Sequence, residues 1–459
     1  MHQFNDTICA PATVPGAGAI SIVRVSGPDA LAIVDKVVRF RSGSASESAA
    51  YRIRFGEIPD VDEVLVSIFR APRSYTGEDS AEISCHASSF IVTSILELLV
   101  RNGARMAAPG EFTQRAFVNG KMDLAQAEAV ADIIQSRTEA SHRVALNQLK
   151  GAYSSELRKL RDKLLELTVL LELELDFSEE EVEFADREKL RSLLDETTAH
   201  IKSLSESFKA GNAIKNGVPV AIVGAVNSGK STLLNALLGE ERAIVSDIAG
   251  TTRDTIEETM VLDGVLYRFI DTAGLRSTSD YVEKIGIERA LSAARKAEVV
   301  IEVIDASSPA LSASAFPGHS PSAPSSHSPS PMDFEPEDWQ TLIRVSNKTD
   351  IAPAIPGTVG ISARDGSGLD ELRKLISGSR KAMASGTATL VTNLRHYEAL
   401  IHALESLDSA KRGIISSLPT DLIAEDLRAA ISELNSIFGE QIGTEDVLGE
   451  IFGRFCIGK

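Results

Sequence analysis

Two stretches of the chain carry apolar residues at alternating steps of three and four. The positions in the first stretch are Leu157, Leu160, Leu164, Leu167 and Leu171. The positions in the second stretch are Leu190, Leu194, Ile201, Leu204 and Phe208. This spacing places the apolar side chains along one face of an α-helix. We therefore predict two long helices that can pack against each other, joined through the acidic turn SEEEVEF.

The end of the chain repeats the helical pattern. Its apolar positions are Leu427, Ile431, Leu434 and Phe438. Thr444 stands directly before EDVLGEIF and is a suitable N-cap, because its hydroxyl can accept a hydrogen bond from a backbone amide of the first turn. We therefore predict a helix followed by a short terminal helix.

Between these helical regions, residues 218 to about 375 alternate β-rich apolar runs with helical stretches. The runs are VPVAIVG, VLYRFIDTAG, VVIEVID, TLIRVSNK and GTVGISA. The Asp-Gly pair at residues 263 and 264 is typical of a two-residue hairpin turn between two strands. The alternation predicts an α/β sheet inserted into a helical domain.

The first 120 residues have a different pattern. They contain the strand-like runs ISIVRVSG, EVLVSIF and AEISCHA and one clear helix, FIVTSILELLVRNG. We predict a multidomain α/β protein with an α+β domain at residues 1–120 and a discontinuous helical domain at residues 121–214 and 381–459. The α/β domain at residues 215–380 is inserted between the two helical parts.

The composition fits a globular protein and limits its partners. The 459 residues suffice for roughly three domains, and 43% of them are hydrophobic. The formal net charge of −18 argues against coating nucleic acid or an anionic membrane through the overall field. Any contact with RNA must therefore be local or shared with a partner.

The cysteines and the N-terminus indicate a cytoplasmic protein. Cys9, Cys85 and Cys456 are too few and too scattered for a disulfide framework or a zinc cluster. The N-terminal residues lack the layout of a secretory signal, and no apolar stretch approaches the length of a membrane span.

One segment, about residues 307–338, is crowded with Ser, Pro and Ala and has no apolar period to bury. We predict a disordered surface insert within the α/β domain. Its histidines are interpreted as solvated spacers, because no other type of metal ligand accompanies them. The insert lies away from the predicted phosphate site, so we expect it to have no effect on catalysis.

GAVNSGKS, from Gly224 to Ser231, matches the phosphate-binding pattern GxxxxGK[ST] and lies between a predicted strand and a predicted helix. Its glycines let backbone amides surround phosphates at a helix N-terminus, Lys230 reaches the terminal phosphates, and Ser231 offers its hydroxyl to magnesium. The loop positions expected to bind nucleotide are Asn227, Ser228, Gly229, Lys230, Ser231 and Thr232.

Further motifs follow in the order expected of a GTPase. GTTRDT supplies Thr252 for the magnesium shell, and DTAG supplies Asp271 and the Gly274 amide. NKTD supplies Asp350, a carboxylate that can accept hydrogen bonds from two N–H groups of guanine. The remaining base-site residues are Asn347 and Lys348 of NKTD and Ser362 and Ala363, which resemble the loop behind the base. Together these motifs predict a Ras-like P-loop GTPase domain.

Leu275 stands where many GTPases have a water-aligning glutamine, so other groups must assist hydrolysis. Asn227 and carbonyls of SDIAG can hold a monovalent cation against the phosphates; the alternative is a loop asparagine bonded to its own backbone. Glu283 can orient the water through a second water; the alternative is a solvated surface acid.

The motifs together resemble the MnmE (TrmE) family, GTPases that modify the wobble uridine of certain tRNAs. The matching segments are TVPGAGAISIVRVSG, SYTGED, PGEFTQRAFVNGKMDLAQAEAVADII, GTTRDT, DTAGLR, IGIERA and the terminal FCIGK. The resemblance covers nearly the whole chain except the Ser/Pro-rich insert. The chain departs from the family at Ala87 and Ser88, where two glycines are common.

The resemblance implies a homodimer formed through the N-terminal domain, which binds 5-formyltetrahydrofolate or 5,10-methylenetetrahydrofolate. It implies that potassium-dependent dimerisation of the GTPase domain activates GTP hydrolysis. By motif position, the folate contacts are Arg24, Glu82, Lys121 and Lys459. The potassium contacts are Asn227, Ser246, Ile248 and Thr251; magnesium takes Ser231 and Thr252; Glu283 is the catalytic acid.

The resemblance also implies partners and a reaction. An FAD-dependent protein of the MnmG (GidA) type would form a heterotetramer with this chain. The complex would install an aminomethyl-type (carboxymethylaminomethyl) group on carbon 5 of the wobble uridine. Cys456 is either a nucleophile in this reaction or an inert thiol.

Two other functions are weighed against this one. A ribosome-assembly GTPase acting as an RNA-docked timer usually has a basic RNA-binding domain, and no basic cluster follows Asp350. A folate enzyme with a purely structural GTPase domain would show no potassium-stimulated turnover of GTP.

Overall fold

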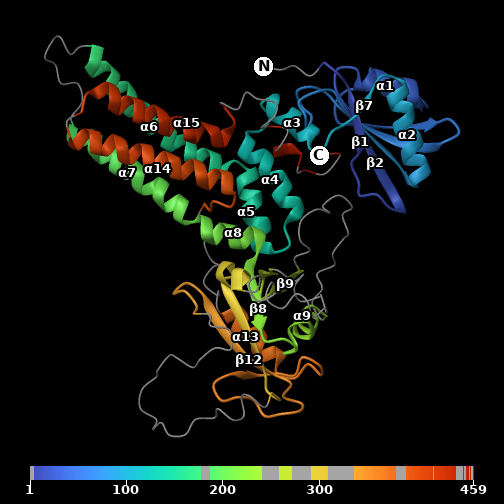
Figure 1. Ribbon diagram of the computed structural model, residues 1–459. Coiled ribbons are helices and arrows are strands. Elements are labelled where there is room, and N and C mark those ends of the chain that lie inside the picture. The colour runs from blue at the N-terminus through green and yellow to red at the C-terminus, as the bar shows by residue number, and fades with distance from the viewer. Residues whose placement is uncertain are drawn as a thin grey trace, which may run out of the picture. The chain divides into compact units, whose positions relative to one another are not determined.

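The computed structural model places the chain in two units, each described here by itself (Figure 1). It describes residues 5–176, 187–239, 258–270, 291–308, 335–378, 389–416 and 418–440, and single positions near the C-terminus. The first unit comprises residues 1–135, 145–202 and 398–459, and the second comprises residues 136–144 and 203–397. Three of the four boundaries between the units fall within helices, namely α5, α7 and α14 (Glu139–Leu149, Arg187–Glu206 and Leu394–Ile415).

The first unit contains a seven-stranded sheet in the order β3-β4-β5-β6-β2-β1-β7. Its strands are β1 Ile8–Pro11, β2 Gly18–Ser26, β3 Arg39–Phe40, β4 Arg52–Ile58, β5 Asp62–Phe69, β6 Ser80–Ala87 and β7 Arg105–Met106. Helices α1 (Ala30–Val37) and α2 (Ser89–Arg101) pack on one face of this sheet. The three strands and the helix predicted for this region are confirmed as β2, β5, β6 and α2.

The two faces of this sheet differ in burial, because successive side chains of a strand point to opposite sides. On one face, alternate residues such as Val23 and Val25 are fully buried against α1 and α2. On the other face, Ile20, Ile53 and Leu65 are 47–68% exposed. The strand registers place Arg24 and Glu82 on this second, exposed face.

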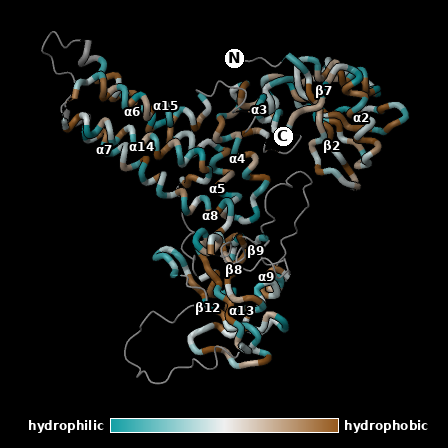
Figure 2. Tube along the Cα trace, viewed as in Figure 1, coloured by the Kyte–Doolittle hydropathy of each residue, from teal (hydrophilic) through white to brown (hydrophobic). Residues whose placement is uncertain are grey.

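The same unit holds the helical region. Its further helices are α3 Glu111–Val118, α4 Leu124–Gln135, α6 Ala152–Asp176 and α15 Thr420–Phe438. The five leucines of the first predicted stripe lie on α6 and are all buried, and α6 packs against α15 as Figure 1 shows. The long helices carry hydrophobic and polar residues in alternation (Figure 2), which is the pattern of helices buried on one face.

The prediction of one helix from Leu190 to Phe208 is wrong at its C-terminal end. Helix α7 stops at Glu206, and Phe208 begins a new helix, α8 (Phe208–Asn216). Ser207 separates them: its hydroxyl donates to the Leu204 carbonyl and accepts the Val391 amide at 3.0 Å. Such side-chain bonds compete with the helix ladder, and periodicity alone does not reveal them.

The second unit contains a six-stranded sheet in the order β13-β12-β11-β8-β10-β9. Its strands are β8 Val218–Gly224, β9 Glu258–Leu262, β10 Val265–Phe269, β11 Val299–Asp305, β12 Thr341–Asn347 and β13 Val359–Gly360. Among the described strands of this sheet, β9 and β10 pair antiparallel, with the predicted Asp-Gly hairpin at their turn, and the other neighbouring strands pair parallel. Hydrophobic residues concentrate along β8 and β12 (Figure 2).

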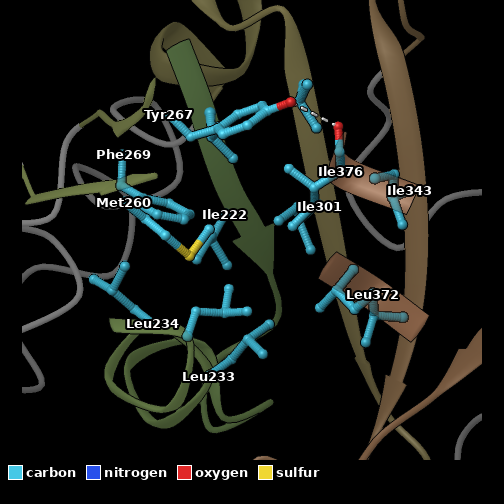
Figure 3. Packing of buried hydrophobic residues seen from close by; sticks show 14 of the residues in the cluster. Ile222, Leu233, Leu234, Met260, Tyr267, Phe269, Ile301, Ile343, Leu372 and Ile376 are labelled. Carbon is cyan, nitrogen blue, oxygen red and sulfur yellow. Dashed lines mark hydrogen bonds between the residues drawn. The ribbon is translucent and has the colours of Figure 1, made fainter. Parts of the chain in front are cut away.

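Helices α9 (Lys230–Gly239) and α13 (Leu369–Gly378) share a core with this sheet. Figure 3 shows Leu233 and Leu234 of α9 and Leu372 of α13 pointing toward the strand residues. The Tyr267 hydroxyl, fully buried, donates to the Ile376 carbonyl at 3.1 Å and so leaves no unpaired polar atom there. Parallel strands then end at one edge, which is where ligands bind in open α/β sheets.

Candidate functional site

The loop between β8 and α9 is shaped by glycines at two close approaches. Gly224 has φ +150°, and a Cβ there would lie 2.3 Å from the Val303 carbonyl oxygen. Gly229 has φ +93°, and a Cβ there would lie 2.1 Å from Nδ2 of Asn347. Asn227 is also left-handed, with φ 62°. This curled backbone leads directly into the N-terminus of α9, where free amides favour an anion.

Lys230, the first residue of α9, folds over this loop. Its Nζ donates to the carbonyls of Gly224 at 3.1 Å and Ala225 at 2.8 Å. Burial lowers the pKa of Lys230, because the site takes the ammonium partly out of water. A phosphate placed beside this ammonium would offset that cost. Of the next two residues, Ser231 is half-buried and Thr232 is exposed.

Asn347 joins three loops at the end of β12. Its Nδ2 donates to the Ser228 carbonyl at 2.8 Å, and its Oδ1 accepts the Ala363 amide at 3.0 Å. Asn347 is only 3% exposed, so its amide group is satisfied within the protein. Ser362 is fully buried, and its amide donates to Ser367 at 3.0 Å. The structure thus brings together the phosphate loop, the NKTD segment and the Ser362–Ala363 loop.

Lys348 and Asp350 follow Asn347. Lys348 has a left-handed backbone, with φ 68°, and its Nζ lies 2.5 Å from Oδ2 of Asp305 at the end of β11. The Asp350 side chain belongs to an exposed residue and is open to a ligand. Asp305 was not singled out from the sequence, because its contact with Lys348 depends on the pairing of β11 with β12.

Several predicted residues lie outside the part of the chain that the structure describes. They are Ser246, Ile248, Thr251, Thr252, Asp271, Gly274, Glu283, Cys456 and Lys459. The predicted helix cap Thr444 and most of the Ser/Pro-rich insert also lie outside it. Within the described residues, no group of three or more His, Cys, Asp or Glu side chains is arranged to hold a metal ion.

A second cluster lies in the first unit. Arg24 and Glu82 are direct cross-strand partners, and Nη2 of Arg24 donates to Oε1 of Glu82 at 2.8 Å. The Arg24 guanidinium also lies 5.5 Å from the ring centroids of Tyr75 and Phe112 and donates to the Gly458 carbonyl at 3.2 Å. The structure therefore brings Arg24 and Glu82 together beside the end of the chain.

Lys121 has a different partner. Its Nζ donates to the Pro72 carbonyl at 2.9 Å.

Cys9 and Cys85 are unsuited to covalent chemistry. Burial raises the pKa of Cys9 and of Cys85 to about 11, so neither forms a thiolate readily. Both are free thiols.

Gly458 lies against the first strand of the N-terminal sheet. Gly458 has φ +94°, and a Cβ there would lie 2.2 Å from the Pro11 carbonyl oxygen. We expect Gly458→Ala to break this contact and to lower the hydrogen-exchange protection of the peptide that contains residue 458 at least tenfold. The control is Gly120→Ala, since Gly120 has φ +68° but no atom of the described part of the chain lies within 4 Å of its Cβ position. Equal protection in both variants would contradict the close contact.

No helix among the described residues is long and apolar enough to span a bilayer.

Comparisons with known proteins cover nearly all of the chain. Residues 7–121 match the family described as "GTP-binding protein TrmE N-terminus", and residues 124–456 match the "MnmE helical domain". A "tRNA modification GTPase MnmE" of Bacteroides fragilis (strain YCH46) is 48% identical, with 99% of this chain and 100% of that protein covered. A protein of the same description from Porphyromonas gingivalis (strain ATCC BAA-308 / W83) is 45% identical, with 100% of this chain and 99% of that protein covered.

Solved structures match less of the chain. The FeoB G-domain from Methanococcus jannaschii is 22% identical, covers 35% of this chain and 96% of its own, and has a TM-score of 0.22. At this TM-score the likeness adds nothing to the fold described above.

Proposed function

Since this chain belongs to the MnmE (TrmE) family of tRNA modification GTPases, we propose that it acts on the wobble uridine of certain tRNAs. With an FAD-dependent partner of the MnmG type, it would install an aminomethyl-type group on carbon 5, using the one-carbon unit of a tetrahydrofolate. GTP hydrolysis would drive association and separation of the GTPase domains. The reaction would take place in the cytoplasm, where tRNA is available.

The observation that carries the GTPase part of this proposal is the position of Asn347. One buried side chain links the Ser228 carbonyl of the phosphate loop to the Ala363 amide of the loop behind the base. Phosphates bound at the N-terminus of α9 and a guanine near Asp350 would therefore contact one rigid assembly. The exposed Asp350 carboxylate would accept the N1–H and the exocyclic amino N–H of guanine, a pair of donors that adenine does not offer.

The described residues fit part of a metal-bound triphosphate site. Ser231 follows Lys230 and offers a hydroxyl of the kind that magnesium uses. Asn227 is exposed at the turn of the loop, and its amide oxygen is a suitable ligand for potassium. Potassium, when bound, would add positive charge beside the phosphates, a role that arginine plays in other GTPases. Lys230 and the amides of the loop would hold the phosphates in place.

The exposed face of the N-terminal sheet supports the proposed homodimer and folate site. Ile20, Ile53 and Leu65 expose apolar area there, and such patches mark interaction surfaces. Arg24 and Glu82 lie on the same face. A folate has a glutamyl tail that pairs with a cation and a pterin that pairs with a carboxylate. We propose that Lys121 and Lys459 complete the site.

The test uses Asn227→Ala. We expect its GTP hydrolysis to be the same in potassium as in sodium, while GTP affinity stays within about threefold of wild type, because the lost ligand serves the cation. The control is Asn216→Ala, an exposed asparagine of α8 whose side chain bonds only Asn212 among the described residues. Potassium stimulation that survives Asn227→Ala would refute the proposed cation site.

The tRNA reaction needs its own measurement. Deleting the flavoprotein partner, or this chain, should remove the modified wobble uridine from digested tRNA as measured by mass spectrometry. Persistence of the modified nucleoside would contradict the proposal. Co-sedimentation with ribosomal subunits, together with intact wobble uridines in the deletion strain, would favour the ribosome-assembly function instead.

A further inference from the structure

An acidic residue outside the recognised GTPase motifs holds the lysine of NKTD. Oδ2 of Asp305 lies 2.5 Å from Nζ of Lys348. The two side chains are 21% and 31% exposed, so water screens the pair less than it screens a surface ion pair. Asp305 closes β11 and Lys348 follows β12, so the contact joins the ends of two neighbouring parallel strands.

Asp305 is itself held in place. Its Oδ1 accepts hydrogen bonds from the Ser307 amide at 2.9 Å and the Ser307 hydroxyl at 2.6 Å. These bonds leave Oδ2 directed at Lys348. Burial opposes ionisation of Asp305, but Lys348 and Ser307 outweigh it and hold the pKa of Asp305 below its usual value.

The backbone of the two segments is fixed as well. Asp305 and Asn347 are partners in the parallel register, and the Ala306 amide donates to the Asn347 carbonyl at 3.0 Å. Lys348 adopts φ 68°, a conformation that non-glycine residues keep only when their surroundings impose it. Both ends of the Lys348 side chain are therefore constrained, its backbone by the register and its ammonium by Asp305.

We propose that Asp305 is a positioning residue for guanine-nucleotide binding, which holds the Lys348 side chain at the ends of β11 and β12. This inference rests on the nucleotide site proposed above. A free lysine loses rotamer freedom when it is ordered, and this loss weakens binding. Because Asp305 orders the Lys348 side chain before the nucleotide arrives, binding does not include that loss. Asp305 touches neither the phosphates nor the attacking water in this scheme, so it affects affinity and not the chemical step.

The position of Ser307 adds a consequence for the Ser/Pro-rich insert. Ser307 is the first residue of that insert in the sequence, and it bonds directly to Asp305. The insert therefore begins beside the base-recognition lysine, although it is remote in sequence from the phosphate loop. Ser307→Ala should weaken nucleotide binding in the same direction as loss of Asp305, by a smaller factor.

The experiment compares Asp305→Asn with Asp370→Asn in the full chain. Asp305→Asn keeps the shape and an acceptor for Ser307 but removes the charge that holds Lys348. We expect a roughly tenfold higher Kd for fluorescent GDP and a raised KM for GTP, with kcat within twofold. Asp370, 88% exposed on α13 beside Arg373, should tolerate the same change without effect.

A double-mutant cycle with Lys348→Met distinguishes a positioning role of Asp305 from a purely structural one. If Asp305 acts by positioning Lys348, its replacement matters only while Lys348 is present. Asp305→Asn should add less than twofold in the Lys348→Met background. A full additional tenfold loss there would assign Asp305 a merely structural role and overturn the inference, as would an unchanged Kd in the single variant. If wild type itself failed to bind GDP, the proposed nucleotide site would fail instead.

Discussion

Replacing Gly229 with alanine should lower GTP affinity at least a hundredfold. The new Cβ would lie 2.1 Å from Nδ2 of Asn347, and φ +93° is unfavourable for alanine. Asn347 cannot move aside without losing its bonds to the Ser228 carbonyl and the Ala363 amide. Leaving such buried groups unpaired costs about 1–3 kcal/mol each, and the left-handed backbone adds about 1 kcal/mol. Isothermal titration calorimetry with GTP or GDP measures the loss.

Gly239 provides a matched control at the other end of the same helix. It closes α9 without a left-handed φ, and no atom of the described residues lies within 4 Å of its Cβ position. Gly239→Ala should change GTP affinity by less than twofold, because an open site accepts a methyl group without displacement. Near-normal binding by Gly229→Ala would show that the three loops do not act as one rigid assembly.

The phosphate loop was predictable because its determinants are local. Strand, glycine positions and helix follow each other within one short segment, so the sequence alone indicated β8, the loop and α9. The Asp-Gly hairpin is a similar case: Asp263 and Gly264 have φ 49° and 78°, as such a turn requires. Here local residue preferences and the tertiary fold agree.

The Asp305–Lys348 pair was not predictable in the same way. The two residues are 43 positions apart, and their contact depends on the register between β11 and β12. Periodicity does not specify which parallel strands are neighbours or how they align. The hydrogen bond from Arg24 to the Gly458 carbonyl joins residues 434 positions apart, so it is even less accessible to prediction from local sequence patterns.

Arg24 and Glu82 also show how residue type alone misleads. As isolated charges they fit a solvated surface, yet their side chains are only 16% and 25% exposed and they pair across two strands. The family resemblance singled them out, and the structure supplies the physical reason for their closeness. The roles of Thr252, Glu283 and Lys459 stay predictions, because these residues lie outside the described part of the chain.

Replacing Arg115 with leucine should destabilise the N-terminal unit by about 3–5 kcal/mol, the usual cost of removing one partner from a buried ion-pair network. Arg115 is fully buried, and its guanidinium donates to Asp6 at 2.7 Å, Glu111 at 3.0 Å and Glu78 at 3.1 Å. Glu111 is itself only 3% exposed, so its carboxylate would lose a charge partner without gaining water.

Hydrogen exchange of β1 and β2 peptides in the full chain measures this loss locally. The control is Arg101→Leu, since Arg101 is 75% exposed beside Glu97 and such pairs contribute about 0–1 kcal/mol. Protection in Arg115→Leu equal to that in the control would show that leucine packing replaces the network without cost.

Acid should have a similar effect on wild type, because it removes the charges that Arg115 pairs with. Burial opposes ionisation of Glu111, but hydrogen bonds from Arg105, the Ala108 amide and Arg115 outweigh it and hold its pKa below the usual 4.5. The unfolded chain therefore binds a proton at Glu111 before the folded chain does. This stabilisation is complete above pH 4.5 and is lost as the pH falls through the folded pKa. The difference in unfolding free energy between wild type and Arg115→Leu should accordingly shrink below pH 4.5. If this difference stayed constant on acidification, charge pairing by Arg115 could not be its source.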